Sequence, residues 1–221
     1  MTIKAFVAGA TGRTGKQIVE VLTEKEIPVV ALVRSLEKGK QLLPSSVELV
    51  VGDVLRPETW EKAIASCNVL LCATGATPSL DFTQPYRVDY EGTKNLITVA
   101  ERQKLDHFVL VSSLCVSQFF HPLNLFWLVL YWKKLAEEAL QQSQIPYTIV
   151  RPGGLLDYDT SESLIMETAD TLFEGRIPRR KVAEVAVEAL FSEKARQKIV
   201  EIITQADAPA QNWEQLFSRV V

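Results

Sequence analysis

The sequence predicts an α/β fold in which buried parallel strands alternate with amphipathic helices. Apolar runs of strand length, rich in Val, Ile and Leu, recur along the chain, as is typical of strands covered on both faces. Segments with helical spacing of apolar residues separate most of these runs. The 221 residues, 47% of them hydrophobic, suffice for one sizeable core. We find no internal repeat or linker, so residues 1–221 are predicted to form a single domain.

The N-terminal stretch carries a dinucleotide-binding pattern. A short apolar run leads into three glycines at three-residue spacing, and helical periodicity follows. In such a turn the first glycine permits a sharp exit from the strand, the second lets backbone approach the pyrophosphate, and the third lets the helix pack on the sheet. The pattern predicts a Rossmann-type, doubly wound parallel sheet of about seven strands. The predicted cofactor-binding residues of this turn are Gly9, Thr11, Gly12, Arg13, Thr14 and Gly15.

Charge and cysteine content exclude several classes of protein. The net charge of -3 shows no basic excess, so nucleic-acid binding is not predicted. The three cysteines are odd in number, widely spaced and in apolar contexts, and fit neither a disulfide framework nor a metal site. With no signal peptide before the first strand, we expect a reducing, cytoplasmic setting, or the plastid stroma for a plant-type source.

The second predicted strand, Ile27 to Val33, bears on cofactor choice. At the tip of this strand an acid would accept hydrogen bonds from the adenosine ribose, whereas an arginine complements a 2′-phosphate. Arg34 stands there, which favours NADP(H) as the cofactor. A solvated surface arginine is the alternative.

The third predicted strand, Val47 to Val51, is followed by an acid and an apolar residue. Asp53 can accept a hydrogen bond from the adenine amino group while Val54 packs on the ring. Asp53 can equally cap a helix that begins near Pro57. The two roles are compatible.

The fourth predicted strand, Val69 to Ala73, runs into a small loop. Thr74 and Gly75 in this loop would let the ribose and nicotinamide of the cofactor pass over the sheet edge. Ala73 is included in the predicted cofactor site for the same reason. A long amphipathic helix is predicted from Tyr86 to Gln103.

The fifth predicted strand, His107 to Ser113, ends in two hydroxyl groups. Ser112 and Ser113 would lie at the carboxyl edge, where open α/β sheets bind ligands, and either can hydrogen-bond a substrate or nicotinamide. Closing a turn is the alternative role for each serine.

The segment Phe119 to Trp132 is unusually apolar. Eight consecutive apolar or aromatic residues, Leu125 to Trp132, are predicted to begin a helix that continues through Lys133. One interpretation is a helix buried between the sheet and a loop. The others are an aromatic wall for a flat ligand, to which Trp127 would contribute, an oligomer face, or a protein or membrane-surface contact.

The C-terminal third contains a predicted strand, Tyr147 to Val150, and a region at 154–181 that shows few regular patterns. We interpret this region as the substrate side of the domain, with a short strand or helix. A basic cluster closes it, in which Arg179 and Arg180 can bind acidic groups of a substrate or simply face solvent. The last predicted elements are a helix at Val182 to Ser192, a strand at Ile199 to Thr204 and a helix at Trp213 to Val221.

Several motifs together resemble the atypical short-chain dehydrogenase/reductases. They are Gly-Ala-Thr-Gly-Arg-Thr-Gly at 9–15, Leu-Val-Arg at 32–34, Gly-Asp-Val at 52–54, Val-Ser-Ser at 111–113 and Thr-Ile-Val-Arg-Pro-Gly at 148–153. Within that superfamily the chain is similar to the NmrA-like and biliverdin reductase B (flavin reductase)-like group. The run Lys133-x-x-Ala136-Glu137 and residues 182–190 look most like its plastid and cyanobacterial members. The resemblance implies cofactor contacts at Pro152 and catalytic positions at Ser112, Ser113 and Lys133.

One departure from this family concerns catalysis. Its catalytic pair is a tyrosine four residues before a lysine, so that the phenol passes a proton and the lysine lowers its pKa. Alignment on Lys133 puts Val129 at the tyrosine position, and Tyr131 has the wrong spacing. The family's acid-base machinery is therefore not carried over to this chain.

These observations lead to two functional hypotheses. The first is an NADPH-dependent oxidoreductase that transfers hydride to a flat conjugated acceptor, a flavin or a linear tetrapyrrole such as biliverdin. Such acceptors need no tyrosine to polarise a carbonyl; Trp127 would stack on the acceptor, and Arg179 or Arg180 would meet its phosphate or propionate. The second is a catalytically silent NADP(H)-binding sensor or scaffold of the NmrA-like type. An isomerase or epimerase that uses NADP catalytically is a third hypothesis, against which the absent tyrosine argues, and the oligomeric state is not predicted.

Overall fold

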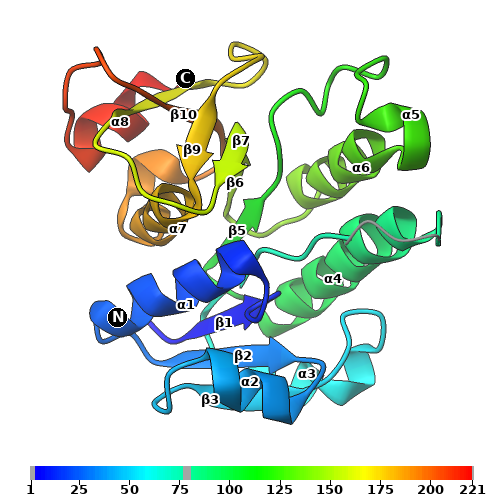
Figure 1. Cartoon of the computed structure of the whole chain (residues 1–221). Coiled ribbons are helices and arrows are strands. Elements are labelled where there is room, and N and C mark those ends of the chain that lie inside the picture. The colour runs from blue at the N-terminus through cyan, green and yellow to red at the C-terminus, as the bar shows by residue number, and fades with distance from the viewer. Residues whose placement is uncertain (1–2, 77–80, 221) are drawn as a thin grey trace.

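The computed structural model describes residues 3–76 and 81–220, apart from the side chain of Phe126. Within these residues the strands form one sheet in the order β3-β2-β1-β4-β5-β6-β10-β9-β7, with β8 also paired to β10 (Figure 1). The strands are β1 (Ala5–Ala8), β2 (Val29–Val33), β3 (Glu48–Val51), β4 (Val69–Cys72), β5 (His107–Val111), β6 (Tyr147–Pro152), β7 (Gly154–Leu156), β8 (Ser163–Thr168), β9 (Arg176–Pro178) and β10 (Lys198–Gln205).

The run from β3 to β10 is parallel throughout. Strand order reverses between β1 and β4, and a crevice for ligands forms at such a switch point in doubly wound sheets. The predicted Rossmann-type fold is confirmed, and its seven parallel strands match the predicted number.

Helices cover both faces of the sheet. Because side chains alternate along a strand, Ala5 and Val7 join one hydrophobic cluster while Phe6 and Ala8 join the other. The first cluster includes residues of α1, α7 and α8, and the second includes residues of α3, α4 and α6. The helices are α1 (Arg13–Glu24), α2 (Leu36–Leu42), α3 (Glu61–Ile64), α4 (Thr93–Gln103), α5 (Asn124–Trp127), α6 (Val129–Gln141), α7 (Arg179–Glu188) and α8 (Trp213–Arg219), with a π-helical turn η2 (Pro85–Gly92) leading into α4 and short 3₁₀ turns η1 (Pro57–Thr59), η3 (Ala189–Phe191) and η4 (Glu193–Ala195).

The prediction of one continuous helix through Leu125 to Trp132 is wrong. Helix α5 ends at Trp127, Leu128 has a left-handed conformation with φ of 52°, and α6 begins at the next residue. The buried Asn124 side chain explains the break, because its oxygen accepts from the backbone N–H groups of Leu130 and Tyr131 at 2.9 and 3.2 Å. A side-chain amide thus replaces the helical carbonyl acceptors at this point.

The region at 154–181 is more regular than predicted. It contains β7, β8 and β9, and β8 pairs antiparallel with β10 over six residues. β9 also pairs with β10, through Arg176 and Thr204. These short strands were missed because β7 pairs with β9, and β8 and β9 pair with β10 further along the chain, and such non-local pairing leaves little trace in local sequence.

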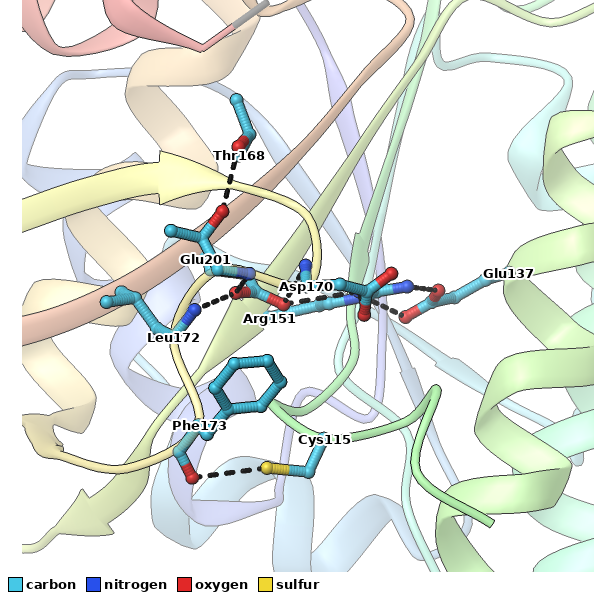
Figure 2. Close-up of polar contacts among 9 residues, drawn as sticks. Cys115, Glu137, Arg151, Thr168, Asp170, Leu172, Phe173 and Glu201 are labelled. Atoms are coloured by element: carbon cyan, nitrogen blue, oxygen red, sulfur yellow. Dashed lines mark hydrogen bonds and ion pairs between the residues drawn. The ribbon is translucent and has the colours of Figure 1, made fainter.

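A buried cluster around Arg151 fixes the centre of the second half of the molecule (Figure 2). The guanidinium, fully buried, donates to Glu137 of α6 at 2.7 and 3.0 Å and to Glu201 of β10 at 3.2 Å. It also bonds Asp170 at 2.9 Å. Burial opposes the charge, but these carboxylates outweigh it and raise the pKa of Arg151. The cluster therefore ties a helix, two strands and the loop after β8 to one point.

The same cluster holds the loop after β8. The Glu201 carboxylate accepts three successive backbone N–H groups, from Asp170, Thr171 and Leu172, at 2.7–3.0 Å. One residue further on, the Cys115 thiol donates to the carbonyl of Phe173 at 3.2 Å (Figure 2). The loop is thus anchored by backbone hydrogen bonds to a buried charge.

Candidate functional site

The main cleft lies where β1 to β4 end at the carboxyl edge of the sheet. Its volume is about 350 Å³, within the range of small-molecule sites. The lining residues come from the loops after each of these strands and from the start of η2. They are Gly9, Thr11, Gly12, Leu32, Arg34, Lys38, Gly52, Asp53, Val54, Leu55, Ala73, Thr74, Gly75, Ala76, Gln84, Arg87 and Val88.

The glycine turn fits a dinucleotide pyrophosphate. Gly9 has φ of 79°, and a Cβ there would lie 2.6 Å from the carbonyl oxygen of Ala73. A Cβ on Gly15 would lie 2.0 Å from the carbonyl oxygen of Gly9, so turn and helix pack in backbone contact. Helix α1 starts at Arg13, and its N-cap residue, Gly12, offers no side-chain cap. The first N–H groups of α1 therefore remain free for an anion beside the cleft.

The residues predicted to select the cofactor stand at the cleft. Arg34 and Lys38 both line it, and Ser35 between them caps α2 by accepting from the N–H of Lys38 at 3.3 Å. In the part of the chain that the structure describes, no salt bridge engages Arg34. Two cations thus border the cleft at the tip of β2, where a 2′-phosphate would lie.

Asp53 lines the cleft but does not cap a helix. Its Oδ1 accepts from the N–H of Leu55 at 2.9 Å, and the following 3₁₀ turn has Arg56 at its N-cap. The capping role predicted as an alternative is therefore wrong. The backbone carbonyl of Asp53 accepts a hydrogen bond from the Trp60 indole at 2.9 Å, which fixes the loop after β3.

A second, much smaller cavity has a volume of about 10 Å³. It lies next to the main cleft, with which it shares the lining residue Thr74. Ser112 at the end of β5 and Lys133 of α6 lie there. The Ser112 hydroxyl is buried, and no hydrogen-bond partner for it is found in the described structure. The remaining lining residues are Asp89, Thr93, Leu110, Val111 and Ala136.

An ion pair borders this small cavity. The Lys133 Nζ lies 2.7 Å from Oδ1 of Asp89, whose side chain is 1% exposed. The other carboxylate oxygen accepts from the N–H of Ala76 at 3.0 Å, which ties η2 to the loop after β4. Burial is the largest single influence and lowers the pKa of Lys133, but the charge and hydrogen bond of Asp89, together with the charges of Cys72 and Glu137, outweigh it, so the net shift of the pKa is upward. Lys133 is therefore a cation in this site.

Other predicted residues lie outside both cavities. Arg13, Thr14 and Gly15 form the first turn of α1 beside the cleft. Pro152 is buried in β6, and Ser113 is not among the lining residues. Trp127 packs on Phe82, with ring centroids 6.0 Å apart.

The two arginines predicted to bind substrate are engaged elsewhere. Arg179 donates to Asp157 at 2.6 Å and to the Thr14 hydroxyl at 3.1 Å. Asp157 also pairs with Arg13 at 2.8 Å, so it bridges the glycine turn and the start of α7. The Arg179 hydrogen bond is the main cause of a lowered pKa of Asp157.

Arg180 lies away from both cavities. It pairs with Glu24 at the far end of α1 and with Glu184 one turn along its own helix. These contacts join α1 to α7 and engage the Arg180 guanidinium, so Arg180 is not included in the site proposed below.

The sequence analysis missed Asp89, although a pattern pointed to it. Asp89, Thr93, Leu96 and Ala100 follow one another at helical spacing and are all buried. A carboxylate on the apolar stripe of a predicted helix requires a buried partner. The same reasoning applies to Lys133, which lies on the buried side of α6 between Leu130 and Ala136. No sequence pattern predicted that Asp89 and Lys133 pair with each other.

The fold and cleft define a Rossmann-type nucleotide-binding protein. A sequence model of the NAD(P)H-binding family matches residues 9–193. The chain belongs to this family, as the resemblance implied.

Relatives span most of the chain. An Arabidopsis thaliana chloroplastic protein, At2g34460, is 44% identical over 99% of this chain and 83% of its own length. TIC 62 of Pisum sativum, also chloroplastic, is 38% identical over 97% of this chain, which spans only 45% of that protein. Sanguinarine reductase of Eschscholzia californica is 29% identical, over 99% of this chain and 96% of its own. The expectation of an oxidoreductase agrees with the last name.

Solved structures share the fold. A Bacillus halodurans protein classed with NAD-dependent epimerases/dehydratases has a TM-score of 0.86 at 27% identity, covering 97% of this chain and all of that one. ChuY, an anaerobillin reductase of Escherichia coli, has a TM-score of 0.79 at 24% identity, covering 94% of this chain and all of its own. Among the described helices of our chain, none combines the length and apolarity needed to cross a bilayer.

Proposed function

We propose that this chain is an NADPH-dependent reductase that transfers hydride to a flat conjugated acceptor, such as a flavin or a linear tetrapyrrole. The observation that supports the proposal is that Thr74 lines both the main cleft and the small cavity that holds Ser112 and Lys133. A nucleotide bound along the glycine turn would bring its nicotinamide toward Ser112 and Lys133. The similarity to sanguinarine reductase supports a conjugated acceptor.

Each part of the cleft has a role in this proposal. The free N–H groups of α1 hold the pyrophosphate, Arg34 and Lys38 neutralise the 2′-phosphate, and Asp53 with Val54 borders the adenine. Bound NADPH supplies the hydride. In this proposal the region at 154–181 forms the acceptor side of the domain.

The first experiment measures turnover. Purified protein is mixed with NADPH and either FMN, riboflavin, biliverdin or sanguinarine, and absorbance at the nicotinamide band is followed. We expect oxidation of NADPH above the enzyme-free rate with at least one acceptor. Oxidation at background rate with all four would contradict the proposal.

Cofactor choice is tested by charge reversal at the tip of β2. We expect Arg34→Asp to weaken NADPH binding by roughly a hundredfold, because it replaces a phosphate partner by a like charge, while NADH binding changes little. Lys40→Asp is the matched control, since Lys40 is exposed in α2, the helix that follows Arg34, and does not line the cleft. Titration calorimetry reads both affinities. An unchanged preference in Arg34→Asp would remove that residue from the site.

A silent NADP(H)-binding sensor or scaffold is the second candidate function. The observation in its favour is Val129 where the family's catalytic tyrosine would stand. Tight NADPH binding without turnover across the acceptor panel would support it over the reductase. For either function we propose a location in the cytoplasm or the plastid stroma.

A further inference from the structure

Asp89 and Lys133 form a buried ion pair that comes from two helical segments and lies beside the proposed nicotinamide end of the cleft. Asp89 lies in η2 and Lys133 in α6, 44 residues apart in sequence, yet their charged atoms are 2.7 Å apart. Removing two charges from water is costly, and such a pair alone is weak evidence for stability. The position beside a cavity suggests another use for it.

Two side chains with hydrogen-bond donors, Ser112 and Lys133, line the small cavity. The ammonium of Lys133 has three N–H groups, and within the described residues its ion pair is with Asp89. The Ser112 hydroxyl is buried and without a partner, and both side chains line the same space of about 10 Å³. That space holds about one oxygen atom or one water molecule. Two hydrogen-bond donors thus flank a space that fits one acceptor atom.

We propose that Asp89 is a positioning residue that keeps Lys133 charged and directed at this cavity, where Lys133 and Ser112 bind a carbonyl oxygen of the acceptor. The inference rests on the proposed reductase function and narrows it to conjugated carbonyl compounds, such as the isoalloxazine ring of a flavin or the lactam of a bilin. Asp89 also fixes the loop after β4 through the N–H of Ala76. One carboxylate therefore orients both the cation and the loop between the two cavities.

NADPH, the reductant in the proposed function, supplies the two electrons that the acceptor gains. Hydride transfer oxidises NADPH to NADP⁺ and delivers two electrons to the acceptor, whose conjugated carbonyl oxygen gains negative charge. Lys133 and Ser112 donate hydrogen bonds to that oxygen, and stabilising developing charge by fixed donors lowers the barrier. A proton from water completes the reduced acceptor. The ion pair thereby takes the place of the phenol that Val129 cannot supply.

The experiment measures flavin binding, so that it does not depend on turnover. Riboflavin is titrated into protein saturated with NADP⁺, and quenching of flavin fluorescence gives its affinity. We expect about tenfold weaker binding in each of Ser112→Ala, Lys133→Met and Asp89→Asn, because each removes or misdirects one hydrogen bond. Ser117→Ala is the matched control, because Ser117 is exposed in the loop after β5 and lines neither cavity, and we expect this variant to bind riboflavin as the natural chain does.

A double variant tests whether Asp89 acts through Lys133. If Asp89 acts through Lys133, the double variant Asp89→Asn with Lys133→Met binds riboflavin no more weakly than Lys133→Met alone. NADP⁺ affinity, measured by calorimetry, stays within about threefold in all variants. Additive losses, a loss in NADP⁺ affinity instead, or no riboflavin binding by the natural chain would each overturn the proposal.

A labelling measurement keeps the inference testable if a variant is unstable or the protein shows no turnover. Without its partner the desolvated ammonium of Lys133 has a lower pKa, so Asp89→Asn increases acetylation of Lys133 by acetic anhydride at pH 8 by roughly tenfold. Lys134 is the internal control. Equal acetylation of Lys133 in Asp89→Asn and in the natural chain would contradict the role of Asp89. Absent turnover with donor-dependent riboflavin binding would instead contradict the reductase function and leave the subsite standing.

Discussion

Two buried cations in this molecule, Arg151 and Lys133, are paired with carboxylates in different ways. Arg151 uses four hydrogen bonds to three carboxylates, and one of these, Glu201, also accepts three backbone N–H groups. Lys133 pairs with Asp89 alone among the contacts found in residues 3–76 and 81–220, and it borders a cavity. A buried cation with several carboxylate partners fixes the chain. A buried cation with one partner beside a cavity has hydrogen-bond donors left for a ligand.

The clusters also differ in what they connect. Arg151 joins β6, α6, β10 and the loop after β8, so it holds the second half of the sheet to its covering segments (Figure 2). Asp89 and Lys133 join α6 to η2 at the edge where the cleft opens. We infer that the first cluster governs stability and the second governs binding. Three predictions extend this comparison to the stability contributed by other buried and exposed charged or titratable groups, in order of expected size.

The largest effect is expected from Arg151→Met. Removing the cation leaves Glu137 and Glu201 buried without their partner, and breaking a buried pair in this way costs about 3–5 kcal/mol. Urea unfolding followed by circular dichroism measures the change. Arg102→Met is the matched control, because Arg102 forms an exposed pair with Glu61, and the cost there is at most about 1 kcal/mol. Equal losses in the two variants would remove the contrast between buried and exposed pairs.

An intermediate effect is expected from His107, which is buried without a charged partner of the kind Lys133 has. Its Nε2 lies 2.9 Å from the Thr148 hydroxyl, which donates to the carbonyl of Ala195 and so accepts from His107. Burial, aided by the charge of Arg196, lowers the pKa of His107 from 6.5 to about 4. Here the fold keeps a titratable group neutral instead of pairing it.

The sign of the pH effect follows from this lowered pKa. Below pH 6.5 the unfolded chain binds a proton at His107 and the folded chain does not, so stability falls as pH falls toward 4. We expect the natural chain to lose about 2 kcal/mol more than His107→Gln between pH 7 and pH 5. Urea unfolding at each pH measures it, and His121→Gln, in a loop, is the control. Parallel pH profiles for the natural chain and His107→Gln would refute the buried neutral state.

The smallest effect is expected at Asp157. This carboxylate is exposed although it contacts Arg13 and Arg179, and exposed pairs add little stability. We expect Asp157→Asn to leave Tm within about 2 °C, because solvent already screens the charge. Differential scanning calorimetry measures Tm, with Glu193→Gln, another exposed acid, as the control. A larger fall in Tm would mean that this bridge belongs with the structural cluster.

Local pattern was enough to predict the first half of the molecule. The glycine spacing at 9–15, the apolar strands and the residue at each strand tip are read within a few positions of each other. They gave the parallel sheet, the glycine turn and the placement of Arg34, Asp53 and Thr74 around one cleft. The π-helical start of the helix before Gln103 and the break at Leu128 were not predicted, because side-chain and backbone contacts at those points override helical periodicity.

The sequence by itself determined the family, the parallel part of the sheet and the glycine turn, since their patterns depend on residues close together in the chain. Only the tertiary structure decided which charges meet. Asp89 finds Lys133, Arg151 finds Glu201 fifty residues away, and Arg180 turns to Glu24. The physical reason is that burial forces a charge to take its partner from whatever element packs against it, and packing brings together residues that no local pattern relates.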